Sequence, residues 1–276
     1  MGSIAVIKIG GGAGIDAAAL APQIARLIES GEPVVVVHGG SGATDDLAAR
    51  LGVENRRLVS PSGHESRRTD AAMRDVFAMA CAGLSNTRLV AALRSAGVDA
   101  VGLSGVDGGV WTAERKGAIR AIEGDRVVIV RDDLSGRVVG VDGALLLGLL
   151  EMGRTPVLCP PAITGDGVVV NVDADRAAAA TAAAIGASRL LLLSNVPGVL
   201  ADPSDPASLI EHAAGEGLGR VREAARGRMK NKVLAAEEAI AAGVSHVVIG
   251  TAQGPDAVLR AIAGQGTMFE AAEIGA

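Results

Sequence analysis

Two glycine-rich segments carry the residues with the clearest potential for chemistry. Residues 6–12 read Val-Ile-Lys-Ile-Gly-Gly-Gly, so Lys8 lies in an apolar run that leads straight into three glycines. A lysine in a buried strand is costly unless an anion pairs with it, and consecutive glycines let backbone N–H groups approach an anion closely. The second segment is His38-Gly39-Gly40-Ser41-Gly42. If both follow neighbouring parallel strands, they line one crevice for an anion.

Two well-known nucleotide-binding motifs do not explain the first segment. A Walker A loop requires Gly-Lys-Ser/Thr after the glycines, and the dinucleotide fingerprint requires a glycine where this chain has Ile15. A flexible turn with an edge lysine is the plain structural alternative. His38 could serve as a general base, but a packing or hydrogen-bonding role in its loop is the simpler interpretation.

Three further segments place charged side chains near expected helix starts. Ser66-Arg67-Arg68-Thr69-Asp70 offers guanidinium groups, which hold a carboxylate through two parallel hydrogen bonds. Asn171-Val172-Asp173-Ala174-Asp175 offers carboxylates that could orient lysines or bind a divalent cation. Residues 227–232 bring lysines to a helix N-terminus, which also favours a phosphate. The structural alternatives are solvated arginines, plain helix capping by Asp173, and surface lysines.

Short β-branched runs alternate with Ala- and Leu-rich stretches along the chain, which predicts a parallel, doubly wound α/β sheet. The expected strands are 3–9, 33–37, 100–103, 155–158, 168–171, 190–193 and 246–249. The expected helices are 16–29, one from about 43, 70–95, 143–152, 174–185 and 229–242. Residues 109–138 interrupt this order, and we expect them to form antiparallel hairpins beside the main sheet. A boundary between two lobes is expected near Gly186.

Composition limits the possible functions. The chain has 276 residues, of which 49% are hydrophobic and only three are aromatic, so base stacking on single-stranded nucleic acid is not expected. A net charge of −5 gives no basic field for nucleic acid or an anionic membrane. No uninterrupted apolar run is long enough for a bilayer, and the first residues predict a strand rather than a signal peptide. Cys81 and Cys159 lack metal-ligand spacing and suit a reducing cytoplasm.

Taken together and in this order, the segments resemble the amino acid kinase family, in its acetylglutamate kinase-like branch. The resemblance extends from about Ile4 to Met268, and Gly266-Thr267-Met268 is similar to the family's closing strand. It implies a three-layer αβα sandwich with a mainly parallel open sheet, the carbamate kinase-like fold. It also implies that residues 1–186 form the amino-acid lobe with the dimer interface and 187–270 the ATP lobe, leaving 271–276 as a flexible tail.

The resemblance implies a role for each matching residue. Lys8 and Lys232 match the lysines that stabilise the transferring phosphoryl group, and Asp175 matches the aspartate that organises them. The expected acceptor-binding residues are Gly39, Gly40, Arg67 for the α-carboxylate, and Asn171. The expected nucleotide-binding residues are Gly11, Ser194, Asn195, Gly198 and Leu200, although many relatives carry Asp at the position of Asn195.

The implied reaction suits these residues. A side-chain carboxylate is already a nucleophile at neutral pH, so no strong general base is needed. Catalysis then consists of positioning and of neutralising charge on the γ-phosphate of ATP with two lysines, Mg²⁺ and loop N–H groups. No protein ligand for the metal is predicted.

Three details are similar to the kinases of carrier-protein-dependent lysine biosynthesis: Ser60–Arg67, Ser104–Gly109 and Gly227–Lys230. Those enzymes phosphorylate 2-aminoadipate, sometimes glutamate, whose amino group is attached to a small acidic amino-group carrier protein. Such a carrier requires a basic rim at the site. The candidates are Arg56, Arg57, Arg67, Arg68, Arg115, Lys116 and Arg120, although a solvated charged hairpin explains the last three equally well.

Other interpretations of the function stay open. Free N-acetylglutamate is the alternative acceptor, and the sequence does not report the length of the acceptor side chain. An inactive amino-acid or nucleotide sensor is a different class of function, which the retention of Lys8, Lys232 and Asp175 disfavours. A dinucleotide-dependent dehydrogenase is weaker still. Because no extra helix precedes the first strand, we expect a homodimer without feedback by arginine.

Overall fold

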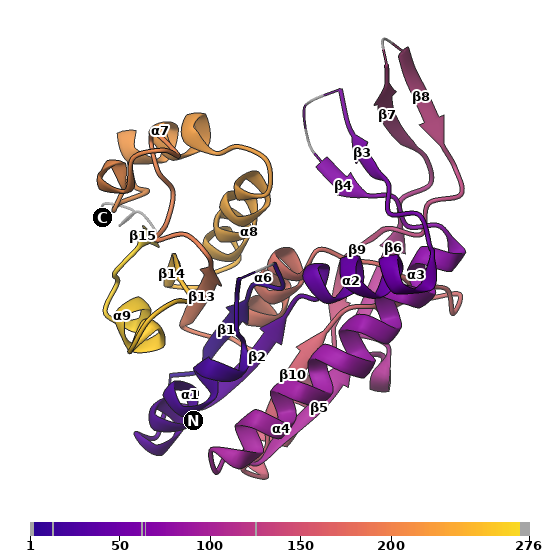
Figure 1. The fold of residues 1–276 in the computed structure, drawn as a ribbon. Helices are drawn as coiled ribbons and strands as arrows, with labels where there is room; N and C mark the ends of the chain where they lie inside the picture. The colour runs from indigo at the N-terminus through magenta and orange to yellow at the C-terminus, as the bar shows by residue number, and fades with distance from the viewer. Residues whose placement is uncertain (1–2, 13, 62, 64, 125, 271–276) are drawn as a thin grey trace.

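A mainly parallel sheet of seven strands runs through the molecule (Figure 1). The computed structural model describes residues 3–12, 14–61, 63, 65–124 and 126–270. In spatial order the strands are β15 (Thr267–Glu270), β14 (His246–Thr251), β13 (Arg189–Ser194), β1 (Ala5–Ile9), β2 (Val34–His38), β10 (Thr155–Cys159) and β5 (Ala100–Ser104). Neighbouring strands are parallel except β14 and β15. The central strands are mostly apolar and buried almost throughout, because both faces of the sheet are covered.

Helices cover the sheet on both faces, which confirms the predicted three-layer sandwich. They are α1 (Ala21–Glu29), α2 (Ser41–Leu51), α3 (Ala71–Ala78), α4 (Thr87–Ser95), α5 (Gly143–Glu151), α6 (Ala174–Ala184), α7 (Glu216–Ala224), α8 (Met229–Ala241) and α9 (Ala257–Ile262). Alternate strand residues point to opposite faces. Val6 therefore belongs to the core that includes α6 and α8, and Ile7 to the core that includes α1 and α9.

The helix starts differ from the sequence-based expectation. An α-helix was expected from residue 16, but the turn Ala18–Leu20 is a 3₁₀-helix and α1 begins at Ala21, with Pro22 in its first turn. α2 begins at Ser41 rather than near residue 43, directly after Gly40. Its start therefore lies in the second glycine-rich loop.

Residues 109–138, expected as hairpins, and several short strands outside that range form small sheets of their own. β6 (Trp111–Arg115) and β9 (Gly136–Val141) join β11 (Ala162–Thr164) and β12 (Val169–Val170) in one sheet. β3 (Arg57–Val59) pairs with β4 (Glu65–Arg67), and β7 (Ile119–Glu123) pairs with β8 (Arg126–Val130). The antiparallel pairing within residues 109–138 was predicted correctly, and these strands form sheets separate from the main one. The β3–β4 pair was not predicted. Along β7 the buried Ala121 lies between the exposed Arg120 and Ile122, so the strand suits a sheet with one solvent-facing side.

A continuous helix of 25 residues, Ala71–Ser95, confirms the predicted long helix. Asp70 caps it by accepting a hydrogen bond from the Met73 backbone N–H at 2.9 Å. A π-helical segment, Met79–Asn86, joins α3 to α4 and was not anticipated. By length and composition alone this helix could cross a membrane, with a mean hydropathy of 1.5. No such span was predicted from the sequence, because charged residues interrupt the apolar run. Leu89 and Leu93 pack in the core of the sandwich.

The proposed lobe boundary falls within one continuous sheet. β1 precedes Gly186 and β13 follows it, and the two strands pair in parallel along their whole length, from Ala5 to Ile9 on β1. The division into an amino-acid lobe and an ATP lobe therefore stays a prediction about function. The predicted tail, residues 271–276, lies outside the described residues.

Candidate active site

Three loops meet at the carboxyl edge of the sheet. In the register of the parallel strands, Ile9 at the end of β1 lies opposite His38 of β2 and Leu193 of β13. The two glycine-rich loops and the turn that begins at Ser194 therefore leave the sheet side by side. This is the edge at which open α/β sheets bind ligands.

The two glycine-rich loops are in direct backbone contact. A Cβ atom added to Gly11 would lie 2.3 Å from the carbonyl carbon of Gly39 and 2.4 Å from the nitrogen of Gly40. The Gly11 carbonyl accepts hydrogen bonds from the Gly42 N–H at 2.7 Å and from Ser41 Oγ at 3.0 Å. Glycine is thus required at Gly11 by close approach, and the start of α2 is fixed against the first loop.

Lys8, Asp175 and Lys232 form a buried lysine–aspartate centre. β1 supplies Lys8, the first turn of α6 supplies Asp175, and the first turn of α8 supplies Lys232. Lys8 Nζ lies 2.6 Å from Asp175 Oδ1, and Lys232 Nζ lies 2.9 Å and 3.0 Å from Oδ1 and Oδ2. The structure therefore joins three side chains that are far apart in the sequence.

Charges within the centre determine the protonation of its members. Burial alone would raise the pKa of Asp175, but the positive charges of Lys232 and Lys8 outweigh it and hold the pKa well below its usual range. Burial lowers the pKa of Lys232, and the carboxylate of Asp175 opposes that shift. Two ammonium groups thus share one carboxylate, which leaves a positive charge for an anion at this point.

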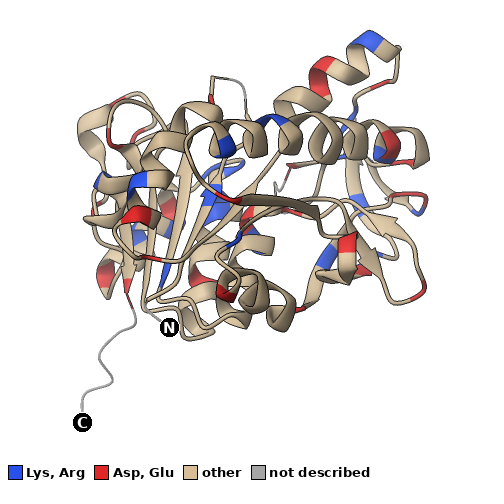
Figure 2. Cartoon of the chain, turned by 90° about the horizontal axis from the view of Figure 1, so that it is seen from below, with Lys and Arg blue, Asp and Glu red and all other residues tan. Residues whose placement is uncertain are grey.

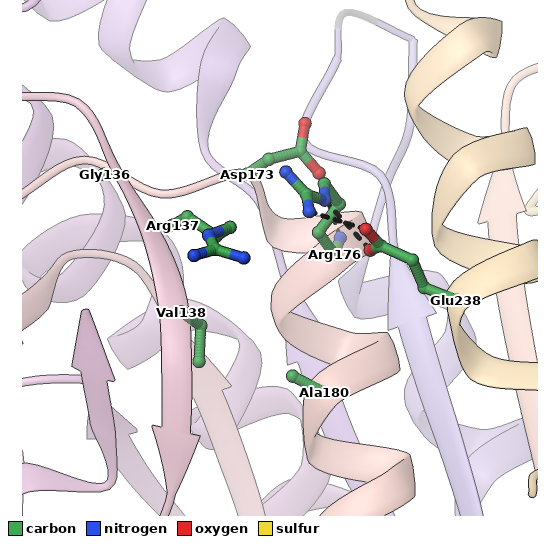
Figure 3. Close-up of a pocket in the computed structure, with 7 residues that line it drawn as sticks. All are labelled: Gly136, Arg137, Val138, Asp173, Arg176, Ala180 and Glu238. Atoms are coloured by element: carbon green, nitrogen blue, oxygen red, sulfur yellow. Dashed lines mark hydrogen bonds and ion pairs between the residues drawn. The ribbon is translucent and has the colours of Figure 1, made fainter. Parts of the chain in front are cut away.

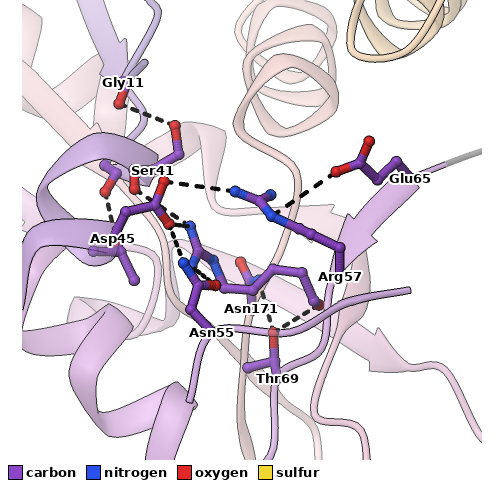
Figure 4. A network of polar contacts seen from close by, with 11 residues as sticks. Gly11, Ser41, Asp45, Asn55, Arg57, Glu65, Thr69 and Asn171 are labelled. Carbon is purple, nitrogen blue, oxygen red and sulfur yellow. Dashed lines mark hydrogen bonds and ion pairs between the residues drawn. The ribbon is translucent and has the colours of Figure 1, made fainter. Parts of the chain in front are cut away.

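Arg67 lies in a second polar network, drawn in Figure 4. Its guanidinium is buried and donates to Asp45 Oδ1 at 2.6 Å, to Asn55 Oδ1, and to the Ser41 carbonyl at 3.3 Å. The sequence analysis missed Asp45 and Asn55. A buried arginine requires hydrogen-bond acceptors, but this requirement does not say which residues supply them.

Arg57 lies directly opposite Arg67 in the β3–β4 pair. Its ion pairs are long, at 3.5 Å to Asp45 and 3.9 Å to Glu65, and about a third of its side chain is exposed. Figure 4 shows Arg57 reaching toward both carboxylates. This arginine is therefore more loosely held than Arg67.

Asn171 is joined to the arginine-bearing segment through Thr69. Its Nδ2 donates to Thr69 Oγ1 at 3.1 Å, and Thr69 Oγ1 donates to the carbonyl of Arg67 at 3.2 Å. The structure thus connects two of the predicted acceptor-binding residues through one hydroxyl group (Figure 4).

The floor of the second glycine-rich loop is formed by the π-helical segment. A Cβ atom at Gly40 would meet Cys81 Sγ at 2.9 Å, so Cys81 packs directly beneath this loop. Asn86 donates to Cys159 Sγ at 3.3 Å and to the Val157 carbonyl at 3.0 Å. His38 is buried, with Nδ1 3.0 Å from the Gly39 carbonyl, which agrees with a packing role.

The predicted nucleotide-binding turn begins where β13 ends. Ser194 is buried, Asn195 is exposed, and Leu200 forms a β-bridge with Leu209. Gly198 is packed so closely that a Cβ atom would lie 2.7 Å from Thr267 Oγ1. These contacts fix the shape of the turn. Within the described part of the chain, no group of three His, Cys, Asp or Glu residues is arranged to hold a metal ion.

Most of the predicted basic rim is neutralised by its own neighbours. Arg56 pairs with Glu54 at 2.6 Å, and Arg68 pairs with Asp132 at 2.8 Å. Arg115 donates to two backbone carbonyls, and Lys116 and Arg120 are exposed. Figure 2 accordingly shows positive and negative residues interspersed along the chain rather than segregated by sign.

Comparison with known proteins assigns the class of protein. The chain belongs to the amino acid kinase family, whose profile matches residues 3–251. Together with kinase-named relatives, this identifies an ATP-dependent phosphotransferase that acts on a carboxyl group. The lysine–aspartate centre is the feature of the structure that suits this chemistry.

Three curated relatives are similar over nearly the whole chain. The LysW-aminoadipate kinase of Deinococcus radiodurans is 44% identical over 263 residues, covering 95% of this chain and 90% of the relative. The LysW-aminoadipate kinase of Thermus thermophilus is 41% identical and covers 95% and 98%. The acetylglutamate kinase of Methanopyrus kandleri is 40% identical and covers 90% and 95%.

Solved structures confirm the fold. The protein smu.665 of Streptococcus mutans matches with a TM-score of 0.75 at 25% identity, covering 99% of this chain and 100% of that one. The carbamate kinase of Giardia lamblia matches with a TM-score of 0.64 at 17% identity, covering 98% of each chain. The carbamate kinase-like fold predicted from the sequence is therefore correct.

Proposed function

We propose that this kinase transfers the γ-phosphoryl group of ATP to the side-chain carboxylate of 2-aminoadipate, or of glutamate, held on a small acidic carrier protein of the LysW type. The substrate's α-amino group is joined to the carrier, and the product is an acyl phosphate. The observation that carries the acceptor assignment is the similarity to two LysW-aminoadipate kinases at 44% and 41% identity.

Lys8 and Lys232 are the residues we assign to charge neutralisation in the transfer. The ammonium groups of Lys8, from β1, and of Lys232, from α8, both pair with Asp175, which keeps them in place beside the glycine-rich loops. As the γ-phosphoryl group is transferred, its oxygens accept hydrogen bonds from Lys8 and Lys232 in place of some of those that Asp175 accepts. Backbone N–H groups near Gly11, Gly39 and Gly40 complete the positive surroundings. The acceptor carboxylate is already ionised, so no residue has to remove a proton.

Mg²⁺ is expected to bind through the nucleotide phosphates, where it would offset their charge. This fits the donor set of the protein, because the carboxylate nearest the centre, Asp175, is fully engaged by two lysines. We assign Ser194, Asn195, Gly198 and Leu200 to the nucleotide. The turn in which they lie leaves the same sheet edge as the glycine-rich loops.

Arg67 and Asn171 are assigned to the α-carboxylate end of the acceptor. The network around Thr69 supports this because it joins both residues. Arg67 is already bound to Asp45 and Asn55, so an acceptor carboxylate would meet a guanidinium whose direction is fixed in advance. The exposed Lys116 and Arg120, with the partly paired Arg56, Arg57, Arg68 and Arg115, form the proposed carrier rim.

We further propose a cytoplasmic homodimer. The long helix Ala71–Ser95 supports the dimer because its π-helical part exposes Met79, half of whose surface is accessible, together with Gly83. An exposed methionine near a glycine on a surface helix lets a second copy of the helix pack closely. The amino-acid lobe that we place at residues 1–186 would then contain this interface.

N-acetylglutamate is the second candidate acceptor. It is favoured by the acetylglutamate kinase of Methanopyrus kandleri, which is 40% identical to this chain. The two acceptors share the reacting carboxylate and differ in what is attached to the amino group. The residues of the lysine–aspartate centre therefore serve either acceptor equally.

A paired assay tests the proposal. Acyl phosphate is trapped with hydroxylamine after incubation with ATP and carrier-linked aminoadipate, carrier-linked glutamate or N-acetylglutamate. We expect the highest kcat/KM with carrier-linked aminoadipate. Product from N-acetylglutamate alone would refute the carrier, and an absence of product from all three acceptors would favour a sensor.

A further inference from the structure

A second polar bridge joins the helices that carry the lysine–aspartate centre. Asp173 caps α6, because its Oδ1 accepts from the backbone N–H groups of Asp175 at 2.9 Å and Arg176 at 3.0 Å. Its other oxygen, Oδ2, accepts from Asn231 Nδ2 at 2.8 Å. One carboxylate thus fixes the start of α6 and reaches across to α8. Helix capping alone would not require the second contact.

The bridge lies immediately beside the catalytic ion pair. Asn231 precedes Lys232 in the first turn of α8, and Asp173 lies two residues before Asp175. The first turns of both helices are therefore joined twice, once by Asp173 and Asn231 and once by Asp175 and Lys232. The N-cap residue of α8, Arg228, makes no side-chain capping bond. The Asn231 contact is thus a restraint on a helix end that lacks a side-chain cap.

A third bridge joins the same helices away from the centre. Arg176 donates to both oxygens of Glu238 at 2.9 Å and 2.6 Å, as Figure 3 shows together with Asp173. Glu238 lies seven residues after Asn231 on α8, about 10 Å along the helix. This pair holds the helices together without touching the turn that carries Lys232. A variant of the Arg176–Glu238 pair therefore tests the packing of the two helices without changing the position of Lys232.

We propose that Asp173 and Asn231 form a latch that positions Lys232 for phosphoryl transfer. Both are positioning residues, since they act through Lys232. A lysine has a flexible four-carbon stem, so its ammonium is placed only as well as its backbone is held. Catalytic groups must be held within about 0.5 Å of the productive geometry. The latch supplies that restraint through Asn231, the residue before Lys232. It acts on the phosphoryl transfer itself, which is the same for every acceptor.

The charge of Asp173 adds a second effect. The charged groups that face Lys232 are Asp175 and Asp173 from α6 and Lys8 from β1. Burial and Lys8 lower the pKa of Lys232, while both aspartates oppose that shift. Removing the charge of Asp173 should therefore make Lys232 lose its proton at lower pH.

Four variants separate the bond from the charge. Asn231→Ala removes the bond, and we expect kcat to fall about tenfold with little change in KM for ATP. Asn231→Asp sets two carboxylates against each other, and kcat should fall further. The double variant Asp173→Asn with Asn231→Asp restores a donor and an acceptor, and kcat should return to within about threefold of wild type. Asp173→Asn alone lets Asn231 turn its amide and keep the bond, so it should mainly shift the alkaline limb of the kcat profile to lower pH.

Glu238→Gln is the matched control, because it weakens the third bridge between the same helices. We expect it to lower Tm and leave kcat unchanged. The latch is refuted if Asn231→Ala lowers Tm as Glu238→Gln does but leaves kcat intact, or if the double variant does not recover activity.

The test is independent of the acceptor, since each variant is compared with wild type on whichever acceptor wild type uses best. If wild type uses none of the three acceptors, the proposed function fails. A double-mutant cycle on the free energy of unfolding then decides the latch, since zero coupling between Asp173 and Asn231 would refute it.

Discussion

The two ends of the candidate site are built in different ways. At the proposed phosphoryl end, Lys8, Asp175 and Lys232 come from β1, α6 and α8, which belong to the main layers of the sandwich. At the proposed acceptor end, Arg57 and Arg67 come from two strands of three residues each, outside the main sheet. Figure 1 shows β3, β4, β7 and β8 projecting together away from that sheet.

The two ends also differ in charge balance, and this difference distinguishes the group that the transfer step requires from the groups that bind the acceptor. The lysine–aspartate centre has two positive charges for one negative charge, so it is incomplete without an anion. The arginine network is balanced within the protein, because Asp45 and Glu65 face Arg57 and Arg67. A rigid centre with excess positive charge suits phosphoryl transfer, the step common to many kinases. The small strands outside the main sheet can vary with the acceptor.

Asp175→Asn gives the largest expected effect and tests the rigid end. Loss of the carboxylate leaves two buried ammonium groups facing each other without a counter-charge. We expect kcat to fall by about 10²–10³-fold, measured by hydroxamate formation, because the lysines no longer hold their places. Tm should also fall, since one partner of a buried ion pair is removed.

The exposed carboxylate of Asp202 provides the control, because it lies on the surface of a turn. Asp202→Asn should leave kcat unchanged. If Asp175→Asn kept more than a tenth of wild-type kcat, the lysine–aspartate centre would not be the site of phosphoryl transfer. The proposed difference in role between the two ends would then be wrong.

Arg67→Lys should have the next largest effect and tests the acceptor end. A lysine cannot meet Asp45, Asn55 and the Ser41 carbonyl in the geometry of the guanidinium. We expect KM for the acceptor to rise about tenfold or more and kcat to change less. Steady-state kinetics with the acceptor varied at saturating ATP measure both constants.

Arg57→Lys is the matched change on the opposite strand. Its longer, partly exposed contacts predict a smaller rise in KM than for Arg67→Lys. An equal rise for both variants would show that the two arginines share the acceptor carboxylate. That result would sharpen the assignment by making Arg57 part of the binding site.

The sequence predicted the rigid end better than the acceptor end. Alternation of apolar strands with helices indicated the sandwich, and a lysine within a buried strand indicated an anion beside Lys8. The pairing of Lys8 with Lys232 through Asp175 came from resemblance to a family. Spacing alone could not supply it, because these residues are separated by more than fifty positions and meet only when α6 packs against β1 and α8.

Features that depend on packing could not be predicted. The partners of Arg67 lie on α2 and the loop after it, and nothing in their local sequence marks them as its acceptors. The π-helical segment that places Cys81 beneath Gly40 continues directly into an α-helix on both sides, so its different hydrogen bonding does not show in the hydrophobic pattern. The second contact of Asp173 was missed because capping already explained an aspartate at that position.

The pH dependence of kcat should report the rigid end alone. The depressed pKa of Asp175 keeps its carboxylate ionised, so Asp175 contributes no acid limb. Burial lowers the pKa of Lys232, and rising pH removes its proton. We therefore expect kcat to decline on the alkaline side at a pH below the ordinary lysine value of about 10.4.

The measurement is kcat from about pH 6 to pH 10 in buffers of constant ionic strength, with Tm followed at each pH. Arg67→Lys should keep the same alkaline limb, because the arginine network is separate from the centre. A profile that stays flat until the protein unfolds would show that Lys232 keeps its proton, or that transfer does not need it.

Arg120→Ser has the smallest expected effect and tests the outer part of the acceptor end. Arg120 is exposed on β7, opposite Ile129 of β8, and makes no ion pair with any residue in the described part of the chain. Such a rim charge mainly changes the rate of encounter with an acidic partner. We expect KM for a carrier-linked acceptor to rise about two- to fivefold at low salt, with the difference fading as added salt screens the charge.

The same variant should leave KM for N-acetylglutamate unchanged, because a small acceptor needs no docking surface. Arg94→Ser, in the last turn of α4 at the far end of the molecule from the hairpin, is the control for the loss of a positive charge (Figure 1). If Arg120→Ser and Arg94→Ser raised KM equally, net charge rather than the hairpin would attract the carrier. If Arg120→Ser raised KM for both acceptors, the β7–β8 hairpin would contact the reacting amino acid itself. The acceptor end would then include β7 and β8 as well as β3 and β4.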